Sequence, residues 1–288
     1  MGTTLLSLLE PKQPRRTRIE SVDAVVDFTP GKLYDIACVP GTTAQWDILF
    51  GLLDHNTQSA VISAHSHIPW QNFNGDRNNV DLYRVDTLTR LIFLVQNLDF
   101  RQYKLVIIDD FHSLYQFALT NLRDKRRGEK QHYKRDANGH RKEQQSPTRK
   151  LQLVIQNLLL FLSNECQKHD VIVITTGKMV NMSQRFFSKS QPASSQEEEE
   201  DTSVLQQIMV PILPLNGPWS GQYAKRLVLY RDWVKNGSQA GLDKSLTIVD
   251  YIQLMEKGQM RVCPQFLCIT SGNGERTFQS GWWGYNLK

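Results

Sequence analysis

The chain has 288 residues, of which 40% are apolar and 22% charged, and its formal net charge is +5. It lacks both a run of about 18 apolar residues and a basic-then-apolar start, which argues against the membrane-spanning and secreted classes. Four cysteines without C-x-x-C spacing argue for reduced thiols rather than a zinc site.

Strands and helices are predicted to alternate along most of the chain. After a flexible N-terminus over 1–19, β-branched and aromatic runs predict strands at 33–38, 59–64, 80–85, 104–108 and 171–175. Apolar residues three and four positions apart predict helices at 44–54, 87–98 and 150–168. Further strands without intervening helices are predicted at 226–231, 245–255 and 260–270. This order favours an α/β fold, with a mostly parallel sheet flanked by helices and an antiparallel extension.

Two polar segments contain little that can enter a core. We predict that residues 119–150 and 183–206 are disordered insertions in a single core domain over 20–288. The first carries eleven Lys/Arg against four Asp/Glu, a local charge of +7, while the rest of the chain sums to −2. A basic excess confined to one segment indicates a surface that faces a polyanion.

The stretch C-V-P-G-T-T-A-Q follows the strand at 33–38, where a phosphate-binding loop G-x-x-x-x-G-K-[ST] would lie. Only Gly41 is retained, and the positions of the two glycines, the Lys and the Ser/Thr are taken by Cys38, Thr43, Ala44 and Gln45. The missing groups would supply the backbone cradle, a charge for the terminal phosphates and a Mg²⁺ ligand. Losing two charged hydrogen bonds of about 1.5–3 kcal/mol each weakens triphosphate binding by about a hundredfold or more.

The replacement residues suggest another role for the start of this helix. Thr42 and Gln45 have the spacing of a capping box, which satisfies the first N–H groups from within the chain. Asp47 favours the helix dipole and disfavours an incoming polyanion. An ordinary strand-to-helix turn without nucleotide-binding ancestry fits this stretch equally well.

Two later blocks bear on that choice. Residues 103–111, Y-K-L-V-I-I-D-D-F, form an apolar strand with an acidic end, as in a Walker B segment where Asp109 would hold the Mg²⁺ shell. The block P-W-S-G-Q-Y-A-K-R-L-V-L-Y-R places Trp219, Arg226 and Arg231 at intervals of seven and five. With S-V-D-A-V-V at 21–26, this order resembles the core of the RecA-like strand-exchange recombinases. Within them, Y-K-L-V-I-I-D-x-F and L-x-R-D-W look most similar to fungal recombinase paralogues that act as recombination mediators.

The resemblance implies a RecA-like P-loop core from residue 20 to about 270, and departures from the family pattern bear on activity. Ser63, Ala64 and His65 stand where the family's catalytic Glu is expected, and T-G-K-M replaces the Asn-Gln pair after the strand at 171–175. A neutral imidazole does not replace a carboxylate that orients water. We therefore expect no catalytic residues and no cofactor, although Lys178 is a candidate for contacting a partner's nucleotide.

The resemblance also implies partners and a location. No Phe-x-x-Ala segment is present, which favours pairing with another recombinase paralogue, in a heterodimer on the recombinase filament, over self-assembly. The basic segment lies where the first DNA-facing loop is implied, and its cations and one tyrosine suit single-stranded DNA. The DNA-binding candidates are Arg123, Lys125, Arg126, Arg127, Lys130, Tyr133, Lys134 and Arg135. Basic clusters within this set also suit import into the nucleus, and a solvated insertion is the simpler alternative.

The function expected from these features is a non-catalytic role in homologous-recombination DNA repair, assisting recombinase filament assembly or stability on single-stranded DNA. The alternative is a DNA-dependent ATPase that retains ATP and Mg²⁺ binding through Asp109, Arg226 or a partner's surface. A RecA-like regulator without a DNA role is a third possibility. No carboxylate follows the pair His65/His67 at a familiar spacing, and Cys166 and His169 lie one turn apart near a helix end. Neither pair is expected to bind a metal.

Overall fold

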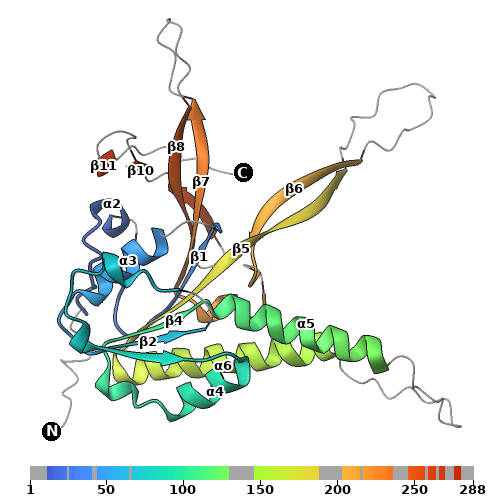
Figure 1. Ribbon diagram of the computed structural model, residues 1–288, viewed down its shortest axis with the longest axis horizontal. Helices are drawn as coiled ribbons and strands as arrows, with labels where there is room; N and C mark the ends of the chain where they lie inside the picture. Colours follow the sequence, from blue (N-terminus) through green and yellow to red (C-terminus); the bar gives the residue numbers. More distant parts are fainter. Residues whose placement is uncertain are drawn as a thin grey trace, which may run out of the picture.

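A central sheet with helices on both faces forms the body of the molecule, so the predicted α/β class is confirmed (Figure 1). The computed structural model describes residues 12–24, 26–40, 44–64, 67–129, 146–187, 203–214, 217–235, 246–256, 259–263, 266–269 and 276–279. Among the helices in these ranges, none combines the length and the apolar character needed to cross a membrane.

The sheet has the strand order β3-β2-β4-β5-β1-β7-β8-β9. Its parallel part consists of β3 (Val80–Arg84), β2 (Ser59–Ser63), β4 (Leu105–Asp109), β5 (Ile172–Phe187), β1 (Leu33–Cys38) and β7 (Lys225–Lys235). The antiparallel extension consists of β8 (Leu246–Glu256) and β9 (Gln259–Cys263). Strands β10 (Phe266–Ile269) and β11 (Arg276–Gln279) form a separate pair. The single strand predicted over 260–270 is therefore two short strands.

The central strands are apolar on both sides because both faces of the sheet are covered. On one face lie α4 (Leu88–Asn97), α5 (Phe111–Glu129) and α6 (Pro147–His169), packed over Val106, Ile108 and Val173. On the other face, α2 (Glu20–Asp23) and α3 (Ala44–Leu53) cover Ile107 and Ile174. Short 3-10 helices lie at Trp70–Asn72, Arg77–Asn79, Phe100–Gln102 and Ser220–Gln222.

The two predicted insertions are in part regular structure. Helix α5 continues to Glu129 and α6 begins at Pro147, so the prediction of a disordered segment is wrong for 119–129 and 147–150. Strand β5 runs on to Phe187 and pairs antiparallel with β6 (Ser203–Pro211), which makes 183–187 and 203–206 strand rather than loop. The rest of each segment lies outside the described residues, apart from Ser146. Its side chain caps α6 by accepting a hydrogen bond from the Arg149 N–H at 3.2 Å.

The N-terminal prediction also needs correction, because residues 12–19 form a strap packed across α3. Arg15 Nη1 donates to the Leu52 carbonyl at 3.1 Å, and Arg18 Nη2 donates to the Asp54 carbonyl at 2.8 Å. The strap crosses at Gly51, where an added Cβ would lie 1.8 Å from the Thr17 carbonyl oxygen. The flexible N-terminus expected over 1–19 is therefore fixed from residue 12 onward, and residues 1–11 lie outside the described chain.

Candidate functional site

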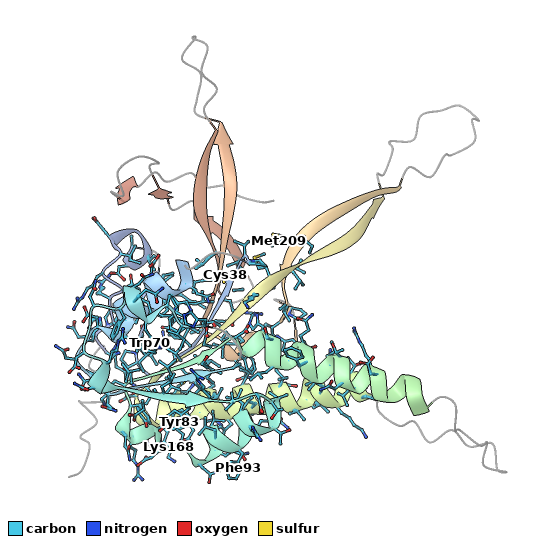
Figure 2. All side chains as sticks on the ribbon, viewed as in Figure 1. Cys38, Trp70, Tyr83, Phe93, Lys168 and Met209 are labelled. Carbon is cyan, nitrogen blue, oxygen red and sulfur yellow. The ribbon has the colours of Figure 1, made fainter. Side chains whose placement is uncertain are left out.

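The carboxyl ends of four neighbouring parallel strands meet at one edge of the sheet, which is where ligands bind in open α/β folds. Strand register places Cys38 of β1 beside Lys178 of β5, and Ser63 of β2 beside Asp109 of β4. Cys38 lies at the edge of the core from which the β5–β6 and β7–β8 hairpins project (Figure 2). This edge is the place predicted for the degenerate nucleotide site.

At the start of α3, the replaced phosphate-loop residues bond to one another. The Cys38 thiol donates to Gln45 Oε1, and both side chains are buried. Burial raises the pKa of Cys38 to about 12, which keeps the thiol protonated at neutral pH. Ala44 is the first residue of α3, and the structure describes its backbone only. Gly41, Thr42 and Thr43 also lie outside the described residues, so neither the loop backbone nor the capping box is tested.

At the end of β4, two consecutive carboxylates have different surroundings. Asp109 is fully buried, and Thr176 Oγ1 donates to its Oδ1 at 2.7 Å. Burial raises the pKa of Asp109 to about 7, so this carboxyl group keeps its proton to a much higher pH than an exposed aspartate does. Asp110 has a left-handed backbone (φ +57°), and its N–H donates to the same Thr176 hydroxyl at 2.9 Å.

Lys178 is the cation nearest to these two carboxylates among the described ion pairs. It follows Thr176 by two residues on β5, so both side chains lie on the same side of the strand. The Lys178 ammonium lies 3.9 Å from Asp110 Oδ2, and its side chain is 47% exposed. The site therefore contains its own cation, supplied by a strand that does not carry the phosphate loop.

These residues do not fit Mg²⁺-bound ATP. The Gln45 amide oxygen accepts from Cys38, the Asp109 carboxyl group is only partly ionised, and the lysine faces Asp110. A phosphate group would approach two carboxylates with one lysine to offset them, which is electrostatically unfavourable. No cluster of three or more possible metal ligands occurs in the part of the chain that the structure describes.

Beneath the site lies a buried ionic network that the sequence reasoning missed. Asp35, in the middle of β1, receives hydrogen bonds from Arg226 Nε and Nη2 at 2.9 and 2.6 Å and from Thr175 Oγ1 at 2.6 Å. His112 Nε2 lies 2.9 Å from Asp35 Oδ1. Burial alone would raise the pKa of Asp35, but its contacts with His112, Arg226 and Thr175 outweigh burial and hold the pKa well below its usual range. The available signal was an aspartate inside the apolar strand L-Y-D-I-A-C, because a charge buried there requires a buried partner.

The Trp/Arg block thus has a structural role in this protein. Arg226 is 2% exposed and fully engaged with Asp35, and it also donates to the Pro214 and Leu213 carbonyls. The Trp219 indole N–H donates to the same Pro214 carbonyl at 3.1 Å. In this structure Arg226 is therefore committed to the buried network and is not exposed at the candidate nucleotide site. Arg231 lies on β7 opposite Asp250 of β8, and the structure describes only the backbone of both residues.

The described DNA-binding candidates lie in the later turns of α5, away from the end of the helix that adjoins this edge. Arg123 is exposed on α5, and Lys125, Arg126 and Arg127 occupy later positions of the same helix, where only the backbone is described. Helical rise places Lys125 about 20 Å along α5 from its first residue. Lys130, Tyr133, Lys134 and Arg135 lie outside the described residues.

The remaining candidates do not form a site in the described part of the chain. Ala64 is half-buried, and its N–H donates to the Asp109 carbonyl at 3.2 Å. His67 is exposed, and His65 is outside the description. Cys166 is a buried free thiol, whereas His169 Nε2 contacts Glu165 at 3.2 Å.

Comparison with known proteins gives a likeness of overall architecture. No family model matches the chain, and no curated protein matches it in sequence. The chain is similar to the crystal structure of the RadB recombinase at 12% identity and a TM-score of 0.47, covering 87% of this chain and 95% of that chain. A likeness at this level assigns no function, so the function has to be inferred from the residues themselves.

Proposed function

We propose that this protein is a non-catalytic relative of the RecA-like recombinases that acts in homologous-recombination DNA repair in the nucleus. In this proposal it pairs with another recombinase paralogue and stabilises the recombinase filament on single-stranded DNA. The recombination part of the proposal rests on the resemblance of the Walker B block and the Trp/Arg block to that family. The non-catalytic part rests on the side chains at the carboxyl edge of the sheet.

The observation that carries the non-catalytic assignment is the internal pairing of the groups nearest the phosphate position. Gln45 accepts from the Cys38 thiol, and Asp109 accepts from the Thr176 hydroxyl. A nucleotide that recruited these groups would first have to break buried hydrogen bonds, each contributing about 1 kcal/mol, and would then ionise a carboxyl group with a raised pKa. Binding therefore begins with a penalty that the retained residues do not offset.

The charge distribution supports a role on nucleic acid. Helix α5 starts beside the site and carries Arg123, Lys125, Arg126 and Arg127 in its later turns. A helix holds neighbouring cations at fixed spacing, and each cation that contacts a phosphate releases condensed counterions. This arrangement supports contact with DNA at the outer end of α5, separate from the degenerate nucleotide site.

The test is a calorimetric titration of the purified full chain with Mg²⁺-bound ATP. We expect a Kd in the millimolar range or weaker, because at least two charged contacts are missing, each of which changes affinity by about tenfold or more. A Kd in the micromolar range would reject the non-catalytic assignment and favour a DNA-dependent ATPase. If such binding occurred, the Asp109→Asn protein is the control that shows whether it depends on the Walker B carboxyl group.

A further inference from the structure

Lys178 is a feature of the described part of the site that the lost phosphate loop does not account for. We infer that its ammonium group is a built-in counter-ion that takes the place of a divalent cation beside Asp109 and Asp110. The inference deepens the proposed function and rests on it, because it names what the site holds in place of a metal-bound nucleotide.

The backbone positions Lys178 for this role. Parallel pairing sets Lys178 beside Cys38, at the end of the sheet where β1 enters the phosphate-loop position. Thr176, two residues earlier on the same side of β5, bonds to the Asp109 carboxyl group and to the Asp110 N–H. One strand segment therefore supplies both the hydroxyl that holds the carboxylates and the cation that faces them.

Asp110 is held so that one of its oxygens faces the lysine. Its left-handed backbone is uncommon for a residue other than glycine, and the bond from its N–H to Thr176 holds it in place. Ser113 Oγ donates to Asp110 Oδ1 at 2.5 Å, while Oδ2 lies 3.9 Å from the Lys178 ammonium. The side chain of Asp110 is only 4% exposed, and among the described residues Lys178 is the cation paired with it.

The same ammonium group acts on Asp109. Burial raises the pKa of Asp109, and the positive charge of Lys178 opposes that rise. The lysine thus balances both carboxylates at once, which is the electrostatic task of a bound metal ion at such a site. Unlike a metal ion, the lysine is covalently tethered, and its charge repels a cation that would bridge to phosphate oxygens.

Removing the ammonium group changes what this site attracts. Without it, two neighbouring carboxylates and the Ser113 and Thr176 hydroxyls form a set of oxygen ligands of the kind that Mg²⁺ and Mn²⁺ prefer. With it, an incoming divalent cation meets a like charge a few ångströms away. The competing explanation is an incidental surface ion pair, because such long, half-exposed pairs generally have little effect.

The experiment titrates the full-length protein with Mn²⁺ at pH 8, where Asp109 is mostly ionised, and follows free Mn²⁺ by electron paramagnetic resonance. We expect Lys178→Met to bind Mn²⁺ at least about tenfold more tightly than the wild type. Lys178→Arg keeps the charge and is expected to match the wild type. The double variant Lys178→Met/Asp110→Asn is expected to lose the gained binding. Circular dichroism checks folding, and Lys178→Gln serves in place of Lys178→Met if that variant does not fold.

The outcomes separate this inference from the proposed function. If Lys178→Met binds Mn²⁺ no better than the wild type, the counter-ion role is rejected, while the non-catalytic assignment stands. If wild-type protein binds Mg²⁺-bound ATP with micromolar affinity, the non-catalytic assignment is rejected by the separate calorimetric measurement. Gained Mn²⁺ binding that persists after Asp110→Asn would place the metal elsewhere and also overturn the inference.

Discussion

Two buried aspartates, on the strands β1 and β4 that flank β5, respond to burial in opposite ways. Asp35 and Asp109 are both 0% exposed. Asp35 is bonded to the Arg226 guanidinium and contacts His112, and its pKa lies well below the usual range. Asp109 accepts a hydrogen bond from the Thr176 hydroxyl, and burial raises its pKa to about 7. Contacts with His112, Arg226 and Thr175 outweigh burial at Asp35, whereas burial outweighs the surrounding contacts at Asp109.

The raised pKa of Asp109 predicts a pH dependence of stability. The unfolded chain releases this proton near pH 3.8, whereas the folded chain keeps it to about pH 7. The folded state therefore binds more protons in this window, and the free energy of unfolding falls as the pH rises through it. Asparagine is neutral throughout and retains the oxygen that accepts from Thr176. The difference in free energy of unfolding between Asp109→Asn and the wild type is measured by urea denaturation. We expect this difference to change in favour of Asp109→Asn by about 2–3 kcal/mol as the pH rises from 5 to 8.

Other groups titrate in the same range, so the informative quantity is the difference between the two proteins. Asp35 does not contribute, because its lowered pKa leaves it ionised in both folded and unfolded chains above pH 5. Asp86→Asn, at an exposed position, is the matched control and is expected to follow the wild type at both pH values. A constant difference between Asp109→Asn and the wild type would contradict a raised pKa in the folded protein.

At the scale of elements, local sequence patterns predicted those features that depend on neighbours along the chain. The parallel strands were predicted because runs such as Leu105–Asp109 are apolar on both faces. Helix α5 was not predicted, because dense surface charge hid the helical spacing of Leu114, Ala118 and Leu122, which pack on the core. The extension of β5 was missed because its second half is a strand only through pairing with β6.

In the candidate site, too, local patterns could be predicted, whereas contacts between residues distant in the sequence could not. Cys38, Gln45 and Asp109 were assigned to one site from the phosphate-loop and Walker B patterns and from the family resemblance that joins them. The partner of Asp35 was not predicted, since Arg226 is 191 residues away in the sequence. The contact of Lys178 with Asp110 depends on which strands are neighbours, and a single sequence does not specify that order.

The strap over α3 determines whether Gly51→Ala stabilises or destabilises the protein. Alanine is favoured over glycine within a helix by about 1 kcal/mol, so Gly51→Ala would stabilise an uncovered α3. In this structure the added Cβ would lie 1.8 Å from the Thr17 carbonyl oxygen, which is backbone and has little freedom to move. We therefore expect Gly51→Ala to destabilise the protein by about 1–3 kcal/mol in thermal or urea unfolding.

The matched control for the strap is Gly221→Ala, where no atom lies within 4 Å of an added Cβ. We expect that variant to unfold within about 0.5 kcal/mol of the wild type. A more stable Gly51→Ala protein would show that residues 12–19 do not pack against α3 in solution. Such a result would also agree with the flexible N-terminus predicted from the sequence.

At the scale of the whole molecule, several elements reach well beyond the compact body. The β5–β6 hairpin, the β7–β8 hairpin and the outer half of α5 all extend away from the region where α2, α3 and β2 lie (Figure 1). The outer parts of these hairpins have only two strands, and two-stranded pairs are marginally stable in water, so these parts suit a role in which another molecule covers them. The proposed heteromeric partner and single-stranded DNA are molecules of that kind.

The last prediction concerns the basic turns of α5. We expect the triple variant Lys125→Glu/Arg126→Glu/Arg127→Glu to retain a single-stranded oligonucleotide at least about tenfold more weakly than the wild type, measured by fluorescence anisotropy. The slope of log K against log salt should also become shallower, by up to about 2 if all three cations contact phosphates. Reversing the exposed Arg84, Arg90 and Arg101 changes the net charge equally and is the matched control. Equal weakening by both variants would mean that overall charge, not α5, attracts DNA, and unchanged retention by the α5 variant would favour a regulator that does not touch DNA.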